Sequence, residues 1–435
     1  MTPFLEELQK WDTKLIAMAK DHGLDWFPIL YETCDYYEMI GTMAYHGMPS
    51  HYGHWSFGKS FERTHTMYNA GLEGLPYELI INSDPSLAYL MEENPLYLQI
   101  LIMAHCIGHS DFFKNNITFS NTRPDQVILR MRNAKRYVDS LINDPSIGVE
   151  KVEQILDAAH ALSLHVPRQH KKYVTQKEQR TELILDIKSG YFKDEESTPN
   201  PDIFPISREE NILAFIAEMS PQLEEWEREL IWIVLDDAQY FMPQIRTKIM
   251  NEGWASYWHY RLMHELELDS GLHIPFLKMH NEVVRPHLGS INPYHLGFFL
   301  FRKIEERHGL EECFIARESL NDEAFLRQYL TEQDCEDLNL FSFSLHKTEY
   351  MIDDVADEEG WKKVKEDLIN QVSGNNIPII TVAEIIDGGI LALEHEHDGR
   401  DLDLDYGDAV VKHITRLWGD IVKLDTTIED EPFEI

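Results

Sequence analysis

Hydrophobic residues recur at helical spacing near the start of the chain, and they predict two helices within residues 1–45. The stretch 45–58 then gathers glycine, proline and three histidines, a composition typical of an ordered loop. β-favouring residues over 75–82 predict a short strand. Asp84 and Pro85 follow this strand, and they predict the start of another helix.

The most hydrophobic segment of the chain, residues 96–113, is apolar on nearly every face of a helix. Asn94 can serve as the N-cap of this helix, and Pro95 suits its first turn. A helix without a polar face has to be buried, so this segment predicts part of the core. Polar residues interrupt both this segment and 230–237 well short of the roughly eighteen apolar residues that span a bilayer. We therefore expect no membrane-spanning helix.

The rest of the chain alternates between helical and irregular stretches, and its character changes near residue 335. Charged helical sequence over 124–190 leads into a connection rich in proline and acidic residues. Beyond 335, β-rich stretches flank helical ones, which predicts a small α+β domain. We expect a mainly α-helical protein with four segments: the N-terminal part of a core (1–123), a helical insertion and irregular connection (124–206), the second part of the core (207–334) and the C-terminal α+β domain (335–435).

The composition fits a fold that needs no crosslinks. The 435 residues are 43% hydrophobic, which is enough for a sizeable core. The four cysteines include no CxxC pair, so neither a disulfide framework nor a cysteine zinc cluster is predicted. The N-terminus carries acidic residues early and lacks the basic start, apolar stretch and cleavage site of a signal peptide. We expect a cytoplasmic protein.

The chain is strongly acidic, with 76 acidic and 39 basic residues and a formal net charge of -37. A surface with this charge repels phosphate backbones and anionic lipid headgroups, so we expect no nucleic-acid partner. General solubility or a saline habitat would also explain the charge. The acidic run over 392–408 has enough carboxylates to attract cations, yet its alternation suits a solvated hairpin and it lacks the EF-hand spacing.

Two segments carry the residue pattern of a metal site. His105 and His109 stand four residues apart in the buried helix, so both imidazoles project from one face and can bind a single cation. In the later segment MNEGWASYWH, Glu252 and His259 lie seven residues apart and share a helix face. The pattern predicts a divalent metal, zinc first, on His105, His109 and Glu252, with His259 as a fourth candidate ligand. The alternative is that the histidines are core residues bonded to backbone carbonyls.

Both segments resemble the ligand helices of gluzincin metallopeptidases. In those enzymes an HExxH helix provides two histidine ligands and a catalytic glutamate, and a later helix with an NEG-x-A motif provides the third ligand. NEGWAS is similar to the later motif. The predicted strand, over 77–82, stands where those enzymes place the edge strand that holds a peptide. The resemblance implies zincin-like helices and a short edge strand in the N-terminal part of this chain.

Position 106 departs from the gluzincin pattern, because Cys106 stands where the catalytic glutamate would be. The gap between the two motifs is also far longer than in compact gluzincins. A hydrolase would need another carboxylate as its general base, and Glu93 and Glu265 are the first candidates, with Glu92 beside them. Cys106 points away from the histidine face, so we interpret it as a small buried core residue rather than a nucleophile.

Four further residues are candidates for the surroundings of the same site. His54 belongs to the aromatic loop before the strand, where the alternative is a loop packed by its own aromatic residues. Asp111 follows the histidines and could orient an imidazole by a hydrogen bond, or the neighbouring asparagines could simply cap the helix. His295 and Arg302 share one predicted helix and are candidates for a pocket.

Several longer strings resemble the stage V sporulation protein R (SpoVR) family in wording and order. They are HWSFGKSFERT, MYNAGLEGLPYELIINSDPSLAYLMEENP, the HxxxHSDFFKNN block, MNEGWASYWH and INPYHLGF, and the resemblance covers most of residues 1–310. It implies a link with spore cortex formation in endospore formers. In bacteria that do not sporulate, members usually accompany a serine protein kinase of the PrkA type and a von Willebrand-type-A-domain protein. The family brings no settled reaction.

Two hypotheses about function follow from these residues. The first is a metal-dependent hydrolase of amide or peptide bonds, linked to spore cortex, envelope or stress physiology. The second is a non-catalytic regulatory or scaffold protein that keeps a metallopeptidase shell and binds partners of the PrkA-type kinase pathway. Cys106 at the position of the general base favours the second hypothesis, and the polar residues gathered in the N-terminal motifs favour the first.

Overall fold

The computed structural model describes residues 3–69, 78–168, 172–192, 198–287, 290–346, 349–355, 357, 360–386 and 388–435. The chain forms two compact units, and each is built from two stretches of sequence. The first unit contains Met1–Lys135 and Pro243–Asn375, and the second contains Arg136–Met242 and Asn376–Ile435. Within the described ranges, no helix is both long enough and apolar enough to cross a bilayer.

The first unit is mainly helical. Its elements are α1 (Pro3–Asp21), β1 (Ile29–Cys34), α2 (Tyr36–Ala44), α3 (Trp55–Asn69), β2 (Glu78–Ile81), β3 (Ser86–Met91), α4 (Leu96–Asn115), the short 3-10 helix η1 (Ile117–Phe119), α10 (Lys248–Glu265), α11 (Ser270–Val283), α12 (Pro293–His308), α13 (Leu310–Ser319), α14 (Asp322–Tyr329), α15 (Glu332–Asp337), β4 (Phe341–His346), β5 (Glu349–Val355) and α16 (Trp361–Gln371). Helices α5 (Val127–Ile142) and α9 (Glu225–Arg246) contain residues of both units.

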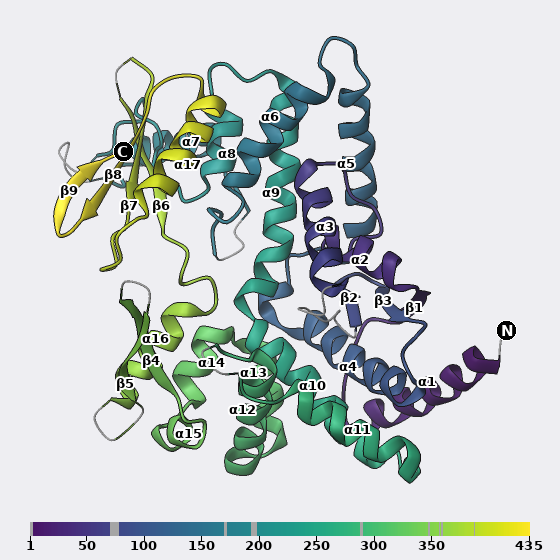
Figure 1. Cartoon of the computed structure of the whole chain (residues 1–435). Coiled ribbons are helices and arrows are strands. Elements are labelled where there is room, and N and C mark those ends of the chain that lie inside the picture. The colour runs from purple at the N-terminus through teal and green to yellow at the C-terminus, as the bar shows by residue number, and fades with distance from the viewer. Residues whose placement is uncertain are drawn as a thin grey trace. The chain divides into compact units, whose positions relative to one another are not determined.

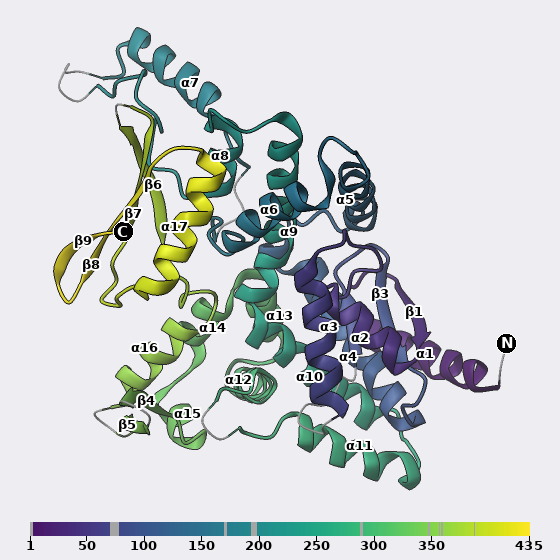
Figure 2. The same ribbon diagram turned by 45° about the horizontal axis from the view of Figure 1, so that its top comes forward.

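The second unit combines helices with a mixed sheet. Its elements are α6 (Gly148–Ala161), α7 (Gln176–Ser189), α8 (Ile212–Met219), β6 (Ile380–Ile386), β7 (Ile390–His395), α17 (Leu404–Trp418), β8 (Val422–Ile428) and β9 (Glu431–Glu434). The strands follow the order β6-β7-β8-β9, with β7 and β8 parallel and the other neighbours antiparallel. Helix α17 lies along one face of this sheet (Figure 2). The prediction of a small α+β region near the C-terminus is therefore confirmed, whereas the four-segment division of the chain stays a prediction.

A three-stranded sheet of order β1-β3-β2 lies beside α4 in the first unit. Strand β2 pairs antiparallel with β3 and forms one edge, which confirms the predicted short strand. The prediction of two helices within residues 1–45 is wrong in part, because β1 lies between α1 and α2 and pairs in parallel with β3. The predicted helix start at Asp84 is also wrong, since β3 begins at Ser86. Pairing between distant segments selected the strands over the local helical pattern.

Helix α4 is buried along almost its whole length, as the sequence predicts. Every residue from Leu98 to Phe113 is buried. The helix begins at Leu96 with Pro95 as its N-cap, so Asn94 does not have the predicted capping role. Helices α10 and α1 pack against α4, and α12 packs against α10 (Figure 1).

Glycines allow these helices to touch backbone to backbone. A Cβ atom added at Gly108 of α4 would lie 2.6 Å from the Cα atom of Ala255 in α10. A Cβ atom added at Gly253 of α10 would lie 2.4 Å from the Cα atom of Gly297 in α12. Neither obstacle is the end of a flexible side chain, so the close approach of α4, α10 and α12 requires glycine at these positions.

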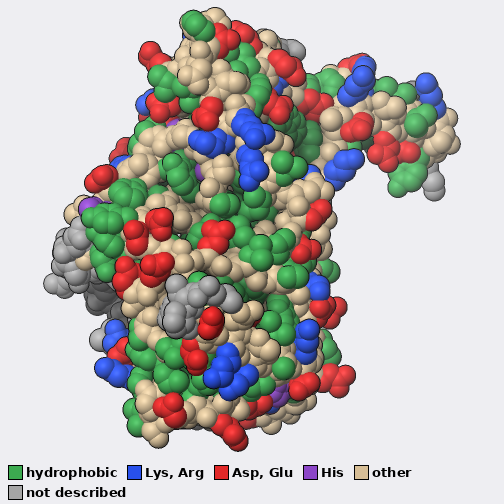
Figure 3. All heavy atoms as spheres, turned by 90° about the vertical axis from the view of Figure 1, so that its right-hand side faces the viewer, with side chains coloured by type: hydrophobic (Ala, Val, Ile, Leu, Met, Phe, Trp, Pro, Cys, Tyr) green, Lys and Arg blue, Asp and Glu red, His purple; other side chains and the backbone are tan. Residues whose placement is uncertain are grey.

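The surface shown in Figure 3 carries acidic side chains over all of its parts, among hydrophobic and basic ones. The excess of negative charge is therefore distributed over this face rather than gathered at one place. A distributed charge of this kind agrees with the general role in solubility that the composition suggests.

We predict that Gly253→Ala lowers the free energy of unfolding by about 3 kcal/mol, because the new methyl group overlaps the backbone of α12. Gly58→Ala in α3 is the matched control, since no atom lies within 4 Å of its added Cβ. There the gain in helix propensity should stabilise the protein by up to about 1 kcal/mol. Urea unfolding of the three proteins measures both values. Equal stability of Gly253→Ala and the wild type would contradict the backbone contact.

Candidate metal centre

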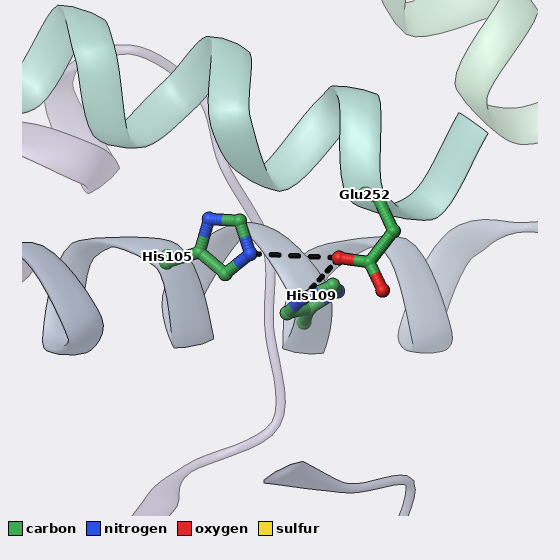
Figure 4. Close-up of side chains that lie close together, drawn as sticks. All are labelled: His105, His109 and Glu252. Atoms are coloured by element: carbon green, nitrogen blue, oxygen red, sulfur yellow. Dashed lines mark ion pairs between the residues drawn. The ribbon is translucent and has the colours of Figure 1, made fainter. Parts of the chain in front are cut away.

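The side chains of His105, His109 and Glu252 converge between two helices. Both histidines come from α4 and the glutamate comes from α10 (Figure 4). The Nε2 atoms of His105 and His109 lie 3.7 Å and 3.4 Å from the same carboxylate oxygen, Glu252 Oε2. One ligand atom from each residue lies within 4.8 Å of the others. The predicted proximity of these residues is confirmed, although they are separated by more than a hundred positions in sequence.

Burial differs between the histidines and the carboxylate. The side chains of His105 and His109 are 2% and 5% exposed, whereas that of Glu252 is 18% exposed. Burial alone would raise the pKa of Glu252, but the two neighbouring imidazoles hold that pKa well below its ordinary value. The site thus presents a charged carboxylate next to two buried nitrogens, and the glutamate oxygen that faces them is itself buried.

Hydrogen bonds fix the orientation of both imidazole rings. His109 Nδ1 lies 2.9 Å from Asn251 Oδ1, and an amide oxygen only accepts, so this nitrogen donates its proton. His105 Nδ1 lies 2.8 Å from His259 Nδ1, and His259 Nε2 lies 2.8 Å from His280 Nδ1. Three imidazoles thus form a chain in which each contact needs one donor and one acceptor. The tautomer of His105, that is, which ring nitrogen carries the proton, therefore sets the direction of the hydrogen bonds along the whole chain.

His259 sits behind His105 rather than beside Glu252. It contacts Nδ1 of His105, whereas the glutamate faces Nε2 on the other side of the same ring. Burial and the neighbouring histidines hold the pKa of the fully buried His259 well below its ordinary value, so its ring is neutral. Both of its nitrogens already have imidazole partners. The geometry makes His259 a positioning residue for His105 rather than a fourth ligand.

Asp111 faces away from the imidazoles, contrary to one of the two sequence interpretations. Its carboxylate accepts hydrogen bonds from Trp254 Nε1 and the backbone N–H of Asp25, both at 2.8 Å, and pairs with Arg317 at 3.4 Å. Burial raises its pKa to about 6 despite these partners. The other interpretation fits better, since the Asn115 side chain donates to the carbonyl of Asp111 near the end of α4. Asp111 therefore joins α4 to α10.

The structure does not bring the predicted general bases to the ligands. Glu265 lies thirteen residues beyond Glu252 on α10, which corresponds to about 20 Å of helix. Its Oε2 atom is 2.7 Å from His22 Nε2. Glu93 is exposed in the turn between β3 and α4, about 14 Å of helix before His105, and Glu92 is its neighbour. Along these helices, the carboxylates therefore lie well away from the three candidate ligands.

The remaining candidates occupy three different surroundings. His54 is buried in the loop before α3, where its ring meets Phe57 edge to face. His295 is half-buried and lines a cavity of about 300 Å³ in the first unit. Arg302 is about half exposed and pairs with Glu306 on the same helix.

Sequence reasoning missed three residues of the site. Asn251 stands next to Glu252 in the motif, so its place on the same helix could be predicted. Its hydrogen bond with His109 could not. Tyr294 lies in the first turn of α12, and its ring stacks on His105 with 6.0 Å between centroids. His280 comes from α11, and no spacing in the sequence connects it with the other histidines. Only the packing of the helices reveals it.

Cys106 is fully buried, as predicted for a core residue. It is absent from the group of potential ligands, and within the part of the chain that the structure describes His105, His109 and Glu252 are the only such group. Where the motif resemblance would place a glutamate, the structure thus has a packed thiol.

The protein is thus mainly helical, with a helix that carries two histidines packed against a helix that carries a glutamate, and a smaller mixed sheet near the C-terminus. Comparison with known proteins assigns it to a family. The family model for the SpoVR like protein matches residues 4–377, and that for the SpoVR-like C-terminal domain matches residues 379–429. This chain belongs to the SpoVR family. It is 33% identical over 468 residues to the protein described as "Uncharacterized protein YcgB" from Escherichia coli (strain K12), covering 96% of this chain and 91% of that relative. No solved structure matches.

Asp322 anchors the beginning of the helix that carries Glu252. Its buried carboxylate accepts hydrogen bonds from the backbone N–H groups of Ile249 and Met250, both at 2.8 Å. These N–H groups belong to the first turn of α10, which has no partner for them within the helix. Burial raises the pKa of Asp322 to about 7, although the two backbone hydrogen bonds oppose this shift.

The raised pKa predicts a pH dependence of stability. The folded protein keeps the Asp322 proton up to about pH 7, whereas the unfolded chain loses it near pH 3.8. The contribution of protonated Asp322 to the free energy of unfolding is therefore complete below about pH 4. It is lost as the pH rises from there through about 7, and the unfolding free energy falls by at most about 1.4 kcal/mol per pH unit. Asp322→Asn should remove this component from the curve of unfolding free energy against pH. Identical curves for wild type and variant would show that Asp322 does not titrate in this way.

Proposed function

We propose that this chain is a zincin-like, metal-dependent hydrolase of amide or peptide bonds. His105 Nε2, His109 Nε2 and the carboxylate of Glu252 would hold one divalent transition ion, zinc first. The observation that carries the proposal is the convergence of these three ligand atoms within 4.8 Å, from helices that touch through glycine.

The donor set fits such an ion. Two imidazole nitrogens and one carboxylate oxygen suit zinc, and iron, manganese and nickel compete for the same ligands. Structural zinc sites are usually closed by four protein ligands, whereas catalytic sites use three and leave one position for water or substrate. His105, His109 and Glu252 offer three ligand atoms, which would leave such a position. When bound, the ion would act as a Lewis acid toward a carbonyl group.

The chain's own residues would orient the ligands and bind the substrate. Asn251 and His259 hold the two imidazoles with Nε2 toward Glu252. Tyr294, stacked on His105, is the titratable side chain that we assign to proton transfer, because neither Glu93 nor Glu265 lies at the site.

Strand β2 supports a peptide as substrate. It is an edge strand, it contacts α4, and among the described residues its sheet neighbour is β3 alone. An extended peptide can pair with a free strand edge through backbone hydrogen bonds, which is a recurring mode of peptide recognition. Family resemblance connects such a substrate with spore cortex, envelope precursors or stress physiology.

One observation favours a second function. Cys106 is fully buried where the gluzincin pattern has its catalytic glutamate. Without hydrolysis, the metal would be structural, and the protein would act as a regulatory scaffold for partners such as a PrkA-type serine kinase and a von Willebrand-type-A-domain protein.

We predict about one transition metal ion per chain in protein purified without a histidine tag, measured by elemental analysis. Glu252→Gln should lose the ion, because a neutral amide is a poor replacement for the carboxylate. Cys106→Ala is the control: it should keep the ion and lose only about 1–2 kcal/mol of stability. Metal-free wild-type protein whose melting temperature does not respond to zinc would disprove the metal site.

Hydrolysis is tested separately with the metal-loaded protein on a fluorogenic peptide library and on peptides from solubilised peptidoglycan. Chelation should abolish turnover and zinc should restore it. Tyr294→Phe should keep the metal and lower kcat by about 10²-fold or more if the phenol transfers a proton. A metal-loaded protein without turnover supports the scaffold instead. Activity that survives in Glu252→Gln but disappears in Cys106→Ala would indicate a thiol mechanism.

A further inference from the structure

The second unit contains a cavity of about 470 Å³. Its interior is mainly apolar, and the side chains that form it include Leu162, Ile212, Ile380, Leu393, Ile414 and Leu424. They come from the end of α6, the start of α8, three strands of the mixed sheet and α17. Pockets that bind small molecules typically measure about 300–1000 Å³ and have apolar walls with a few polar groups. The proposed hydrolase site uses none of these residues.

The mouth of this cavity is acidic. The segment 396–408 contains six acidic residues and one arginine, and Asp398, Arg400, Asp401 and Asp403 from it line the opening. All four of these residues are exposed. The segment leads from β7 into α17, so the predicted hairpin is wrong. An opening with an excess of negative charge raises the local concentration of cations.

The carboxylates at the mouth have separate partners. Asp398 pairs with Arg400, which compensates the arginine. Asp401 lies 3.1 Å from His397 Nε2 and accepts the backbone N–H of Glu429 at 3.1 Å. These carboxylates hold the loop in place and do not converge on one point. The arrangement therefore does not suit a bare metal ion.

Two further side chains at the cavity indicate whether the ligand carries a positive or a negative charge. Tyr406 is 76% exposed at the rim, and the face of a phenol ring attracts cations. His395 lies in the wall, and burial lowers its pKa, so it stays neutral. Arg400 already pairs with Asp398, so the lining residues offer no further Lys or Arg side chain that could bind an anion.

We propose that this cavity binds a small organic cation. Its apolar body would occupy the space between α17 and the sheet, and its ammonium or guanidinium group would lie at the acidic mouth beside Tyr406. The lining comes from both regions matched by the family models, since it includes residues on either side of position 378.

The test compares two probes of equal shape and opposite charge, 6-phenylhexylamine and 6-phenylhexanoate, by calorimetry at low salt. The amine should bind at least about tenfold more tightly than the carboxylate, and added salt should reduce the difference. Ala161→Trp fills the cavity and should weaken amine binding more than tenfold. Ala409→Trp, an exposed position of α17 outside the lining, is the matched control and should bind like the wild type.

A second variant keeps the test sharp if Ala161→Trp fails to fold. Tyr406→Ser changes an exposed side chain and should weaken binding of the amine while leaving that of the carboxylate unchanged. Several results would overturn the proposal: no binding of the amine, equal binding of the two probes, or amine affinity that Ala161→Trp leaves intact. A basic peptide that binds more tightly than the amine and is blocked by Ala161→Trp would mean that the occupant is a protein segment.

Discussion

The contact between α4 and α10 is the constraint on which the candidate site depends. Gly108 and Ala255 let the two backbones meet, and Gly253 does the same for α10 and α12. Zinc bonds are only about 2 Å long, so a ligand set spread over two helices tolerates little change in their separation. Ordinary helix pairs lie about 8–10 Å apart because side chains keep their axes separated. The small residues thus allow the three candidate ligands to converge, in addition to their role in packing.

Charge inside this contact is arranged in two layers. Nearest the solvent, Glu252 carries the negative charge that two imidazoles stabilise. Deeper in the core, His259 and His280 extend the polar network without adding charge, because burial holds the pKa of each below its ordinary value. A neutral imidazole donates through one nitrogen and accepts through the other, so the first hydrogen bond of the chain determines the next. If His105 Nε2 binds an ion, its Nδ1 must be the donor, and His259 then donates through Nε2 to His280.

The convergence of the candidate ligands was predictable because a helix converts spacing into direction. His105 and His109 share a face at any position of a regular helix, and the motif of Glu252 marks a second helix. The same rule did not supply His280, which reaches the network through the packing of α11. Strands β1 and β3 were missed because their pairing joins segments more than fifty residues apart. Local patterns therefore predicted the helices and the candidate ligands, whereas tertiary contacts determined the small sheet and the outer residues.

Cys106 lies where the glutamate of the gluzincin pattern would be poorly accommodated. The thiol lies in a fully buried part of α4, close enough to Tyr31 of β1 to influence its pKa. A glutamate there would place a charge in the core, at a cost of several kcal/mol unless it were paired. The sheet side of α4 is thus committed to packing. The side of α4 that faces α10 and α12 carries polar groups instead, with Glu252 partly exposed and Tyr294 stacked on His105.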